Sequence, residues 1–301
     1  MSISVVMTTY NGENKLLTQL TTLRDQTRKA DEVLIFDDCS TDKSVAIIQN
    51  FIYENHLYEW TLIENADNKG ARKNFAAGIN TARGDLIFLC DQDDEWKPEK
   101  IETMASVLEE RDEISLLVSD YDVRYEKNAD RIRRLLSKQY GKERIEKAEL
   151  NGLTFEPIRP RFTFAFKKEM ISLFNSIRTE EDELERVLWD IALLRGSLYI
   201  LNEKLVTHVR YADHMTKADH LLRNSRIEEV RYRRILAERL LNNLEGIENR
   251  AWLEEYIKVA QMREDAISRK SLKDLFALSK TKEYMPRSVS WMADLFSAFR
   301  S

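Results

Sequence analysis

Four short apolar runs at regular intervals constrain the fold of this chain more than any other feature. They are rich in β-branched residues, and about 25–30 residues separate the start of one run from the start of the next. Runs of this kind are typical of strands buried on both faces, and the spacing leaves room for a helical crossover between neighbours. The pattern predicts parallel strands at residues 3–7, 33–36, 61–63 and 86–89.

The segments between these runs carry helical signals. Val45, Ile48 and Ile52 recur at the three- and four-residue spacing of an amphipathic helix. With 8 Gly and 4 Pro in 301 residues, the chain is poor in the residues that a loop-rich all-β fold needs. We therefore expect an α/β fold with an open, mostly parallel sheet and flanking helices over residues 1–121, and a charged helical region from Asp219 onward.

Polar residues follow the predicted strands, and those after the first, second and fourth strands are of most interest. Ligands of open parallel sheets bind beyond the carboxyl ends of the strands, so these residues are candidates for binding. No GxGxxG or GxxxxGK motif is present, which leaves dinucleotide-binding and P-loop functions without support. The candidates are Thr8, Thr9, Tyr10 and Asn11 after the first run, Asp37 and Asp38 after the second, and Asp91, Gln92, Asp93 and Asp94 after the fourth.

The stretch FLCDQDDEW places four acids within five residues. Carboxylates this close repel one another unless water, basic side chains or a bound cation offset the repulsion. The position at a strand end favours a cation, because Mg²⁺ and Mn²⁺ bind a few carboxylates together with diphosphate oxygens. The i, i+2 pair Asp91 and Asp93 can put one carboxylate on such an ion and the other on a neighbouring ligand group. We expect Asp94 and Glu95 to start a helix, where the helix dipole favours acids.

Several motifs in order over residues 3–215 resemble the family 2 glycosyltransferases, which have the GT-A fold. The DQDDEWKPEKI form is most similar to a bacterial branch that includes many rhamnosyltransferases of surface polysaccharide synthesis. The resemblance implies a GT-A domain at 1–217, with a nucleotide-binding half at 1–121 and an acceptor half at 122–217, and a helical C-terminal region at 218–301. The motifs are VVMTTYNGE, LIFDDCSTDKS, NKGARKNFAAGINTARGDLIFLCDQDDEW, LWDIALL and HVRYADHMT.

The resemblance also implies roles for the matching positions. Asp93 would be the principal ligand of a Mn²⁺ or Mg²⁺ cofactor, Asp91 would reach the ribose or the metal, and His214 would approach the metal or the diphosphate. Asp37 and Asp38 would hold the base and ribose. The nucleotide-binding set as a whole is Thr8, Thr9, Tyr10, Asn11, Asp37, Asp38, Gly70, Arg72, Asn74, Asp91 and Gln92.

Asp190, in LWDIALL, matches the catalytic base of the family. Trp189 stands directly before Asp190, where the family commonly has an acid. The preceding acid in this chain is Glu185, so either Asp190 or Glu185 could be the base. The implied reaction is a single displacement in which the base deprotonates the acceptor hydroxyl opposite the leaving nucleotide, with inversion at the anomeric carbon.

The implied donor is a nucleoside-diphosphate sugar, with UDP and dTDP both compatible because uracil and thymine share the edge that a carboxylate would contact. The implied acceptor is a saccharide, glycolipid or glycoprotein. Nucleic acid is not expected, because 47 basic and 52 acidic residues give a net charge of -5. No apolar run approaches the roughly 20 residues of a membrane span, and two cysteines far apart do not make a disulfide framework. We expect a cytoplasmic protein.

The C-terminal segment 269–301 carries a further signal. Residues 269–287 contain six Lys or Arg against two Asp or Glu. An apolar helical stripe follows this basic stretch in the sequence. Core packing or a homodimer contact is one interpretation of the stripe. Peripheral contact with the inner face of the cell membrane is the other, because basic residues beside an aromatic face suit anionic lipid. The stripe comprises Val289, Met292, Phe296 and Phe299, with Trp291 and Leu295 beside it.

Three other functions compete with glycosyl transfer. A sugar-nucleotide pyrophosphorylase would need a Gly-rich basic loop after the first strand, and TTYNGENK lacks one. A DxDx(T/V) phosphatase would need Thr or Val where Glu95 stands. A non-catalytic nucleotide-sugar-binding scaffold would bind the donor and turn nothing over.

Overall fold

The computed structural model describes residues 1–125, 141–210, 226–286 and 290–299. For Phe296 it describes the backbone only. The chain divides into two compact units. The expected boundary at residue 217 falls among residues that the structure does not describe, and it stays a prediction. The first unit comprises 1–147, 159–188 and 197–212, and the second comprises 148–158, 189–196 and 213–301.

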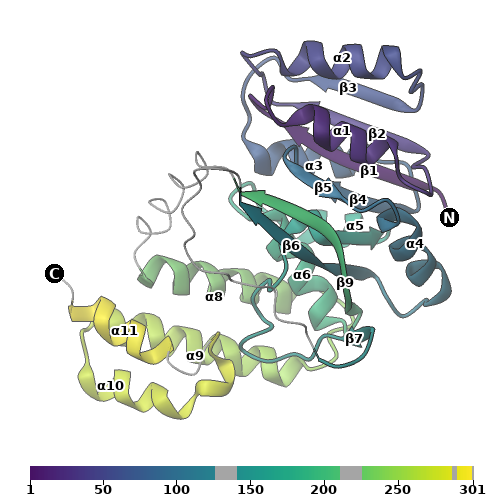
Figure 1. Cartoon of the computed structure of the whole chain (residues 1–301). Coiled ribbons are helices and arrows are strands. Elements are labelled where there is room, and N and C mark those ends of the chain that lie inside the picture. Colours follow the sequence, from purple (N-terminus) through teal and green to yellow (C-terminus); the bar gives the residue numbers. More distant parts are fainter. Residues whose placement is uncertain (126–140, 211–225, 287–289, 300–301) are drawn as a thin grey trace. The chain divides into compact units, whose positions relative to one another are not determined.

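The parallel strands expected from the four apolar runs are confirmed. They lie in the order β3-β2-β1-β4, each parallel to its neighbour (Figure 1). The residues of β1, β2 and β4 are almost all buried, as strands covered on both faces require, whereas in β3, at the edge of the sheet, only Trp60 is buried. The bounds are β1 Ile3–Thr9, β2 Glu32–Asp37, β3 Trp60–Glu64 and β4 Leu86–Cys90.

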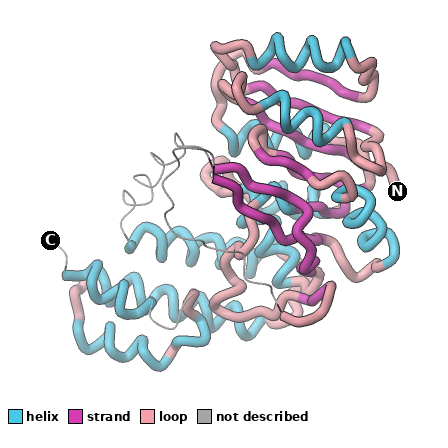
Figure 2. Tube along the Cα trace, viewed as in Figure 1, coloured by secondary structure: helices cyan, strands magenta, loops and turns pink. Residues whose placement is uncertain are grey.

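Helices join these strands and cover both faces of the sheet (Figure 2). Side chains of a strand alternate between faces, so Val5 and Val6 point to opposite sides. Val5 packs in one core cluster with the apolar residues of α1 and α2, whereas a Cβ on Gly78 of α3 would lie 2.3 Å from Val6. The helices are α1 Leu16–Arg24, α2 Ser44–Glu54 and α3 Ala71–Thr81.

Beyond β4 the sheet becomes mixed, in the order β4-β8-β6-β9-β5, with β7 paired to β9. β8 runs antiparallel to β4 and β6, while β6 and β9 are parallel to each other. The bounds are β5 Asp94–Trp96, β6 Leu116–Tyr125, β7 Ile145–Lys147, β8 Phe164–Lys167 and β9 Leu198–Arg210. The helical pieces of this region are α4 Lys100–Glu110, η1 Arg161–Thr163, α5 Met170–Ile177 and α6 Leu184–Leu194.

The prediction that Asp94 and Glu95 start a helix is wrong. Both lie in β5, which pairs antiparallel with β9 and places Asp94 opposite His208, and α4 begins only at Lys100. The dipole argument failed because β5 forms by pairing with a strand about 110 residues further along the chain.

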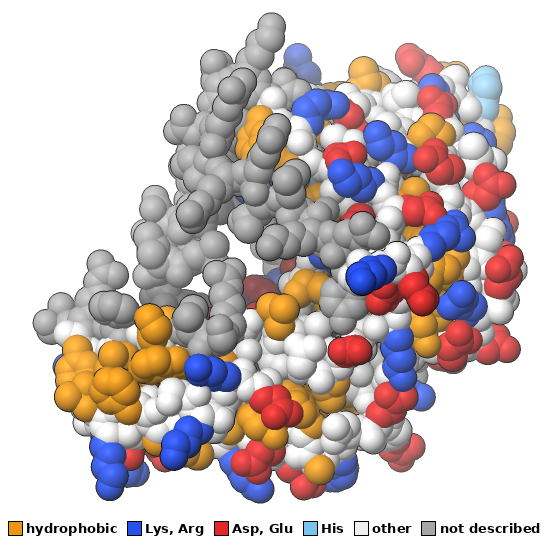
Figure 3. Space-filling model, turned by 60° about the horizontal axis from the view of Figure 1, so that its bottom comes forward, with side chains coloured by type: hydrophobic (Ala, Val, Ile, Leu, Met, Phe, Trp, Pro, Cys, Tyr) orange, Lys and Arg blue, Asp and Glu red, His pale blue; other side chains and the backbone are white. Residues whose placement is uncertain are grey.

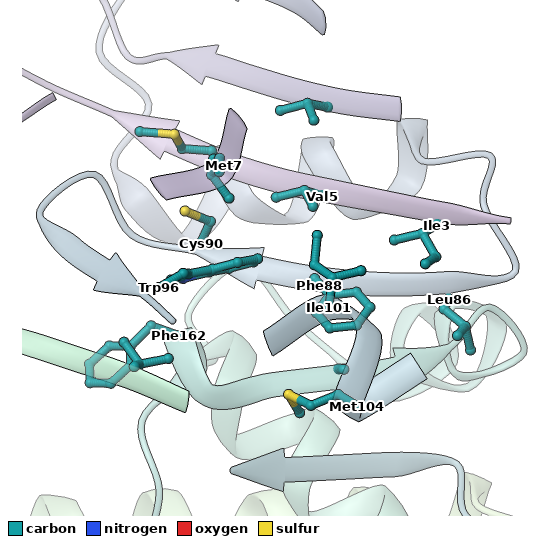
Figure 4. Close-up of a cluster of buried hydrophobic side chains, with 14 of the residues drawn as sticks. Ile3, Val5, Met7, Leu86, Phe88, Cys90, Trp96, Ile101, Met104 and Phe162 are labelled. Atoms are coloured by element: carbon teal, nitrogen blue, oxygen red, sulfur yellow. The ribbon is translucent and has the colours of Figure 1, made fainter. Parts of the chain in front are cut away.

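The main core of the first unit lies between the sheet and α1, α2 and α4. Figure 4 shows Met7 and Cys90 from neighbouring strands, with Phe88 and Trp96 packed beside them. The rings of Phe88 and Trp96 lie 6.2 Å apart. This core places the carboxyl ends of β1 and β4 side by side, which fixes where the polar loops that follow them lie.

Glu109, at the end of α4, gives a pH-dependent prediction. Hydrogen bonds from Arg28 (2.7 and 2.8 Å) and from the amino group of Met1 (2.9 Å) lower the pKa of Glu109 to about 2. The pKa in an unfolded chain is about 4.3, so this network stabilises the fold above that pH and its contribution is lost as pH falls toward 2. We expect Glu109→Gln to lower the free energy of unfolding by about 1–2 kcal/mol at neutral pH, since the side chain is partly exposed. Urea unfolding across pH 7 to 2 checks this, and a deficit that does not shrink in acid would contradict it.

The second unit is helical after residue 225, as expected for the C-terminal region. In the part of the chain that the structure describes, no helix has both the length and the apolar composition needed to cross a bilayer. The helices are α8 Arg226–Asn243, α9 Arg250–Ser268, α10 Leu272–Ala277 and α11 Ser290–Phe299, with the short turns η3 Leu278–Lys280 and η4 Lys282–Tyr284 after α10.

Candidate active site

The loop that follows β1 is tied to the loops that follow β2 and β4. The backbone N–H of Tyr10 donates to Oε1 of Gln92 at 2.9 Å, and Nε2 of Gln92 donates to the carbonyl of Tyr10 at 3.1 Å. The N–H of Asn11 donates to Oγ of Ser40 at 2.9 Å, and the N–H of Thr41 donates to Oδ1 of Asn11 at 2.8 Å. Three strand ends therefore form one continuous polar edge, as the sequence predicts. We call these tied loops the donor edge, after the nucleotide donor that the sequence predicts to bind there.

Asp37 organises this edge from inside. It is 1% exposed, and its carboxylate accepts hydrogen bonds from Oγ1 of Thr9 (2.8 Å) and from the N–H and Oγ of Ser40 (2.8 and 2.6 Å). A buried carboxylate with three donors is well stabilised and fixes the turn around it. Contact between Asp37 and a base stays a prediction.

Asp38 organises the entry to α3. It is 3% exposed and accepts from the N–H groups of Lys69 and Gly70 (2.8 Å each) and from Nδ2 of Asn65 (3.1 Å). Gly70 has φ +82°, a conformation that suits glycine. The segment that borders the predicted nucleotide site is thus held by Asp38, and direct contact of Asp38 with ribose stays a prediction.

The remaining predicted nucleotide-binding residues differ in exposure. Tyr10 is 46% exposed, whereas Thr8 is buried at 9%. Asn74 is buried at 1%, and its Nδ2 donates to the carbonyl of Phe36 at 2.9 Å, which ties α3 to β2. Arg72 donates to the carbonyl of Glu181 at 2.9 Å. Tyr10 therefore has an exposed ring at the donor edge. Asn74 has a structural contact instead, because its hydrogen bond to Phe36 holds the start of α3 against β2.

Asp91 lies beside a cation that the sequence does not reveal. Nε of Arg161 donates to Oδ1 of Asp91 at 2.8 Å, and NH1 of Arg161 lies 3.5 Å from Oε1 of Glu185. The guanidinium also lies 4.9 Å from the ring centroid of Phe75. Burial acts to lower the pKa of Arg161, but the two carboxylates outweigh it and raise the pKa. One Arg thus neutralises the first acid of the cluster and connects it to the first turn of α6.

Asp93 is the carboxylate that the sequence predicts as the principal metal ligand. Its side chain is 14% exposed, and Nζ of Lys15 lies 3.9 Å from Oδ2. Among the residues that the structure describes, no three His, Cys, Asp or Glu side chains gather closely enough to hold a metal by themselves. Mg²⁺ and Mn²⁺ are commonly held by one or two carboxylates plus substrate phosphates. The carboxylate of Asp93 is chemically suited to such a shared site, and the metal roles of Asp93 and Asp91 both stay predictions.

Asp94 turns away from the edge. It is 1% exposed, and its Oδ1 lies 2.6 Å from Nδ1 of His208. Burial raises the pKa of Asp94 to about 6, and the hydrogen bond to His208 acts in the opposite direction. The ring of His208 stacks on Phe162 with centroids 4.9 Å apart. Because Phe162 follows Arg161 in η1, the same short turn contacts Asp91 through Arg161 and the partner of Asp94 through Phe162.

The two candidates for the catalytic base, Asp190 and Glu185, differ in the unit to which they belong and in their exposure. α6 belongs to the first unit up to Leu188 and to the second from Trp189, so Glu185 and Asp190 fall in different units. Asp190 is 1% exposed, whereas the side chain of Glu185 is 24% exposed. His214 lies outside the described residues.

Sequence reasoning missed several residues of this site, namely Arg161, His208, Ser40 and Lys15. Arg161 stands in PRFTFAF with no motif around it, and only the packing of η1 against β4 brings it to Asp91. His208 is the first residue of the HVRYADHMT match, yet its partner Asp94 is fixed by strand pairing. Ser40 lies inside LIFDDCSTDKS, and its hydroxyl near two acids was the one available signal.

Comparison with solved structures shows the class of fold. The fold is similar over 100% of this chain and 90% of the other to Staphylococcus aureus TarS in complex with UDP-GlcNAc, with a TM-score of 0.67 at 19% identity. It is also similar to the mannosyltransferase PcManGT from Pyrobaculum calidifontis in complex with GDP-Man and Mn²⁺, over 98% of this chain and 85% of the other, at 16% identity and a TM-score of 0.56. At these identities the likeness shows the fold, and the expected GT-A class is confirmed.

The chain belongs to glycosyl transferase family 2, whose family model matches residues 4–172. One curated relative is the amylovoran biosynthesis glycosyltransferase AmsB of Erwinia amylovora, 32% identical over 111 residues, which are 36% of each protein. The match covers little more than a third of the length of such curated relatives, namely 36–37% of the relative's own length in three cases. The family that the motifs suggest is thus confirmed.

Proposed function

We propose that this chain transfers a sugar from a nucleoside-diphosphate donor to a saccharide, glycolipid or glycoprotein acceptor during synthesis of a cell-surface glycan. The observation that carries the proposal is the donor edge, where the loops after β1, β2 and β4 are tied by hydrogen bonds through Gln92, Asn11 and Ser40. Family membership supports the reaction class. The amylovoran relative and TarS support surface glycans as the product class and UDP as a donor nucleotide.

In this proposal the donor edge binds the nucleotide. The exposed ring of Tyr10 offers a face for the base, and backbone groups held in place by Asp37 and Asp38 surround the ribose. Buried, fully bonded carboxylates keep these loops in one conformation before the donor arrives, which reduces the ordering cost of binding. UDP and dTDP remain the two candidate nucleotides.

The diphosphate is proposed to lie at Asp93. A divalent metal held there between the carboxylate and the phosphates would neutralise charge on the leaving group. Lys15, 3.9 Å from Asp93, adds positive charge at the same place. Arg161 balances Asp91, so the cluster does not carry four uncompensated acids. His214 stays a proposed further ligand.

Transfer is proposed to invert the anomeric centre. A carboxylate of α6 accepts the proton of the acceptor hydroxyl while the oxygen attacks the anomeric carbon from the side opposite the diphosphate. Asp190 is the proposed base, and Glu185 is the alternative. The two free cysteines, Cys39 and Cys90, suit the reducing cytoplasm proposed as the location.

A thermal-shift panel of UDP-, dTDP- and GDP-sugars, each with and without Mn²⁺, tests the donor. Ligand bound only to the folded state raises the melting temperature by mass action, so one nucleotide class should stand out. Tyr10→Ala should weaken that donor about tenfold, because stacking of a base on an aromatic ring is worth about 1–3 kcal/mol. Tyr53→Ala, at a ring 82% exposed on α2, is the matched control and should change nothing.

Two outcomes of this panel would go against the proposal. A melting temperature unmoved by every nucleotide sugar would remove the donor site. Stabilisation by a donor without transfer or donor hydrolysis in any acceptor screen would favour the non-catalytic scaffold instead.

A further inference from the structure

Helix α11 is amphipathic in the reverse of the usual sense, with a charge buried and apolar side chains facing out. Asp294 is 0% exposed and receives hydrogen bonds from Arg263 at 2.7 and 3.0 Å and from Arg226 at 2.9 Å. Met292 and Phe299 lie about 140–160° around the helix from Asp294 at 100° per residue. They are 40% and 47% exposed. The ion pairs hold α11 to α8 and α9 and leave its apolar side uncovered.

Helix α10 continues this apolar surface. Leu275 is buried, whereas Leu272 and Phe276, one helical turn apart, are 52% and 55% exposed. The ring of Phe276 lies 5.8 Å from that of Trp291 in α11, so the two helices share one surface. Figure 3 shows hydrophobic side chains gathered at this end of the molecule, with Lys and Arg beside them. We call Leu272, Phe276, Trp291, Met292 and Phe299 the α10–α11 patch.

The chain around the patch is basic, in contrast with the rest of the protein. Residues 269–286 carry five exposed Lys or Arg against two exposed acids, a balance of +3, while the whole chain has -5. An exposed aromatic and aliphatic surface bordered by basic side chains matches the two parts of an anionic membrane surface, acyl chains and charged headgroups. The exposed basic residues are Arg269, Lys270, Lys273, Lys280 and Lys282.

We propose that the α10–α11 patch docks this protein on a membrane surface rich in anionic lipid. Phe276, Trp291 and Phe299 enter the headgroup region, and the five basic residues pair with lipid phosphates. A second copy of this chain fits less well, because a two-fold interface centred on the patch brings both basic segments together. The proposal concerns a surface of the second unit and does not depend on the proposed transfer reaction.

Flotation with the full-length protein tests the docking surface. We expect binding to vesicles of phosphatidylcholine mixed with phosphatidylglycerol, weak binding to phosphatidylcholine alone, and release at high salt. Lys270→Ala with Lys273→Ala should weaken binding about 30-fold, since each basic residue near the surface contributes about fivefold. Phe276→Ser with Phe299→Ser should abolish it. These four side chains are exposed, so the variants should keep their circular dichroism and melting temperature.

The matched control is Tyr53→Ser with Tyr58→Ser, which removes two aromatic rings that are 82% and 89% exposed outside the patch. This control should bind vesicles like the wild type. Equal binding by the Phe276/Phe299 variant and the control would overturn the proposal, as would a wild type that stays free of anionic vesicles. Light scattering that shows a dimer broken by the Phe276/Phe299 change, without vesicle binding, would assign the patch to a second copy.

Discussion

Asp190→Asn is expected to lower the rate of glycosyl transfer by about 10²–10⁴-fold and to leave donor affinity nearly unchanged. A general base acts on the acceptor hydroxyl in the transition state, so its loss lowers kcat without removing donor contacts. Asn keeps the size and hydrogen-bonding shape of the 1% exposed side chain, which limits damage to packing. Donor binding by calorimetry and transfer by release of nucleoside diphosphate check the two parts separately.

Glu185→Gln is the matched control, because Glu185 is the other acid of α6 that could act as the base. Its carboxylate lies 3.5 Å from NH1 of Arg161, so its removal should alter the surroundings of Asp91 and affect donor affinity more than the rate. If instead Asp190→Asn transfers sugar at a near-normal rate while Glu185→Gln is inactive, the assignment of the base reverses. The inverting mechanism itself would then still stand.

Asp93→Asn is expected to abolish the dependence of donor binding on Mn²⁺. In the proposed site Asp93 is the carboxylate that holds the metal against the diphosphate, and an amide is a poor ligand for such hard cations. For the wild type, we expect the donor to raise the melting temperature more with Mn²⁺ than without it. For the variant, the donor should give the same small rise with and without the metal. The transfer rate should fall at least as far as for Asp190→Asn, because both binding and leaving-group stabilisation are lost.

Asp122→Asn is the control for this change. Asp122 also lies beside a lysine, with Nζ of Lys204 at 2.7 Å, but it is 45% exposed and lies within β6 rather than in the loop after β4 that carries Asp93. It should keep the Mn²⁺ response of the wild type. A metal response that persists in Asp93→Asn and disappears in Asp91→Asn would move the metal to Asp91, whose bond to Arg161 would then have to open.

The sequence predicted the parallel half of the sheet well, because that prediction depends on local pattern. A strand covered on both faces must be apolar along its whole length, and crossover helices set the spacing, so both signals are visible in the chain itself. β6 and β9 pair as parallel neighbours about 80 residues apart, and β8 inserts beside them in the opposite direction. No local pattern records such pairing.

The acidic cluster shows the same limit at the scale of single residues. Local reasoning correctly placed Asp91 and Asp93 at a strand end, but it assigned Asp94 to a helix start. Pairing of β5 with β9 instead buries Asp94 against His208. The burial of Asp37 and Asp38 under donors from neighbouring loops was equally invisible, since the donors lie on other segments of the chain.

The sequence by itself determined the strand-and-crossover pattern, the acidic and polar strand ends, and, through the order of its motifs, the family. These features depend on residue type and spacing along the chain. Only the tertiary structure decided that Arg161 balances Asp91, that Asp94 belongs to the interior, and that α11 buries Asp294 while it exposes Met292 and Phe299. The reason is physical: the partner that decides whether a charge is buried or exposed comes from a distant part of the chain, and only packing brings the two together.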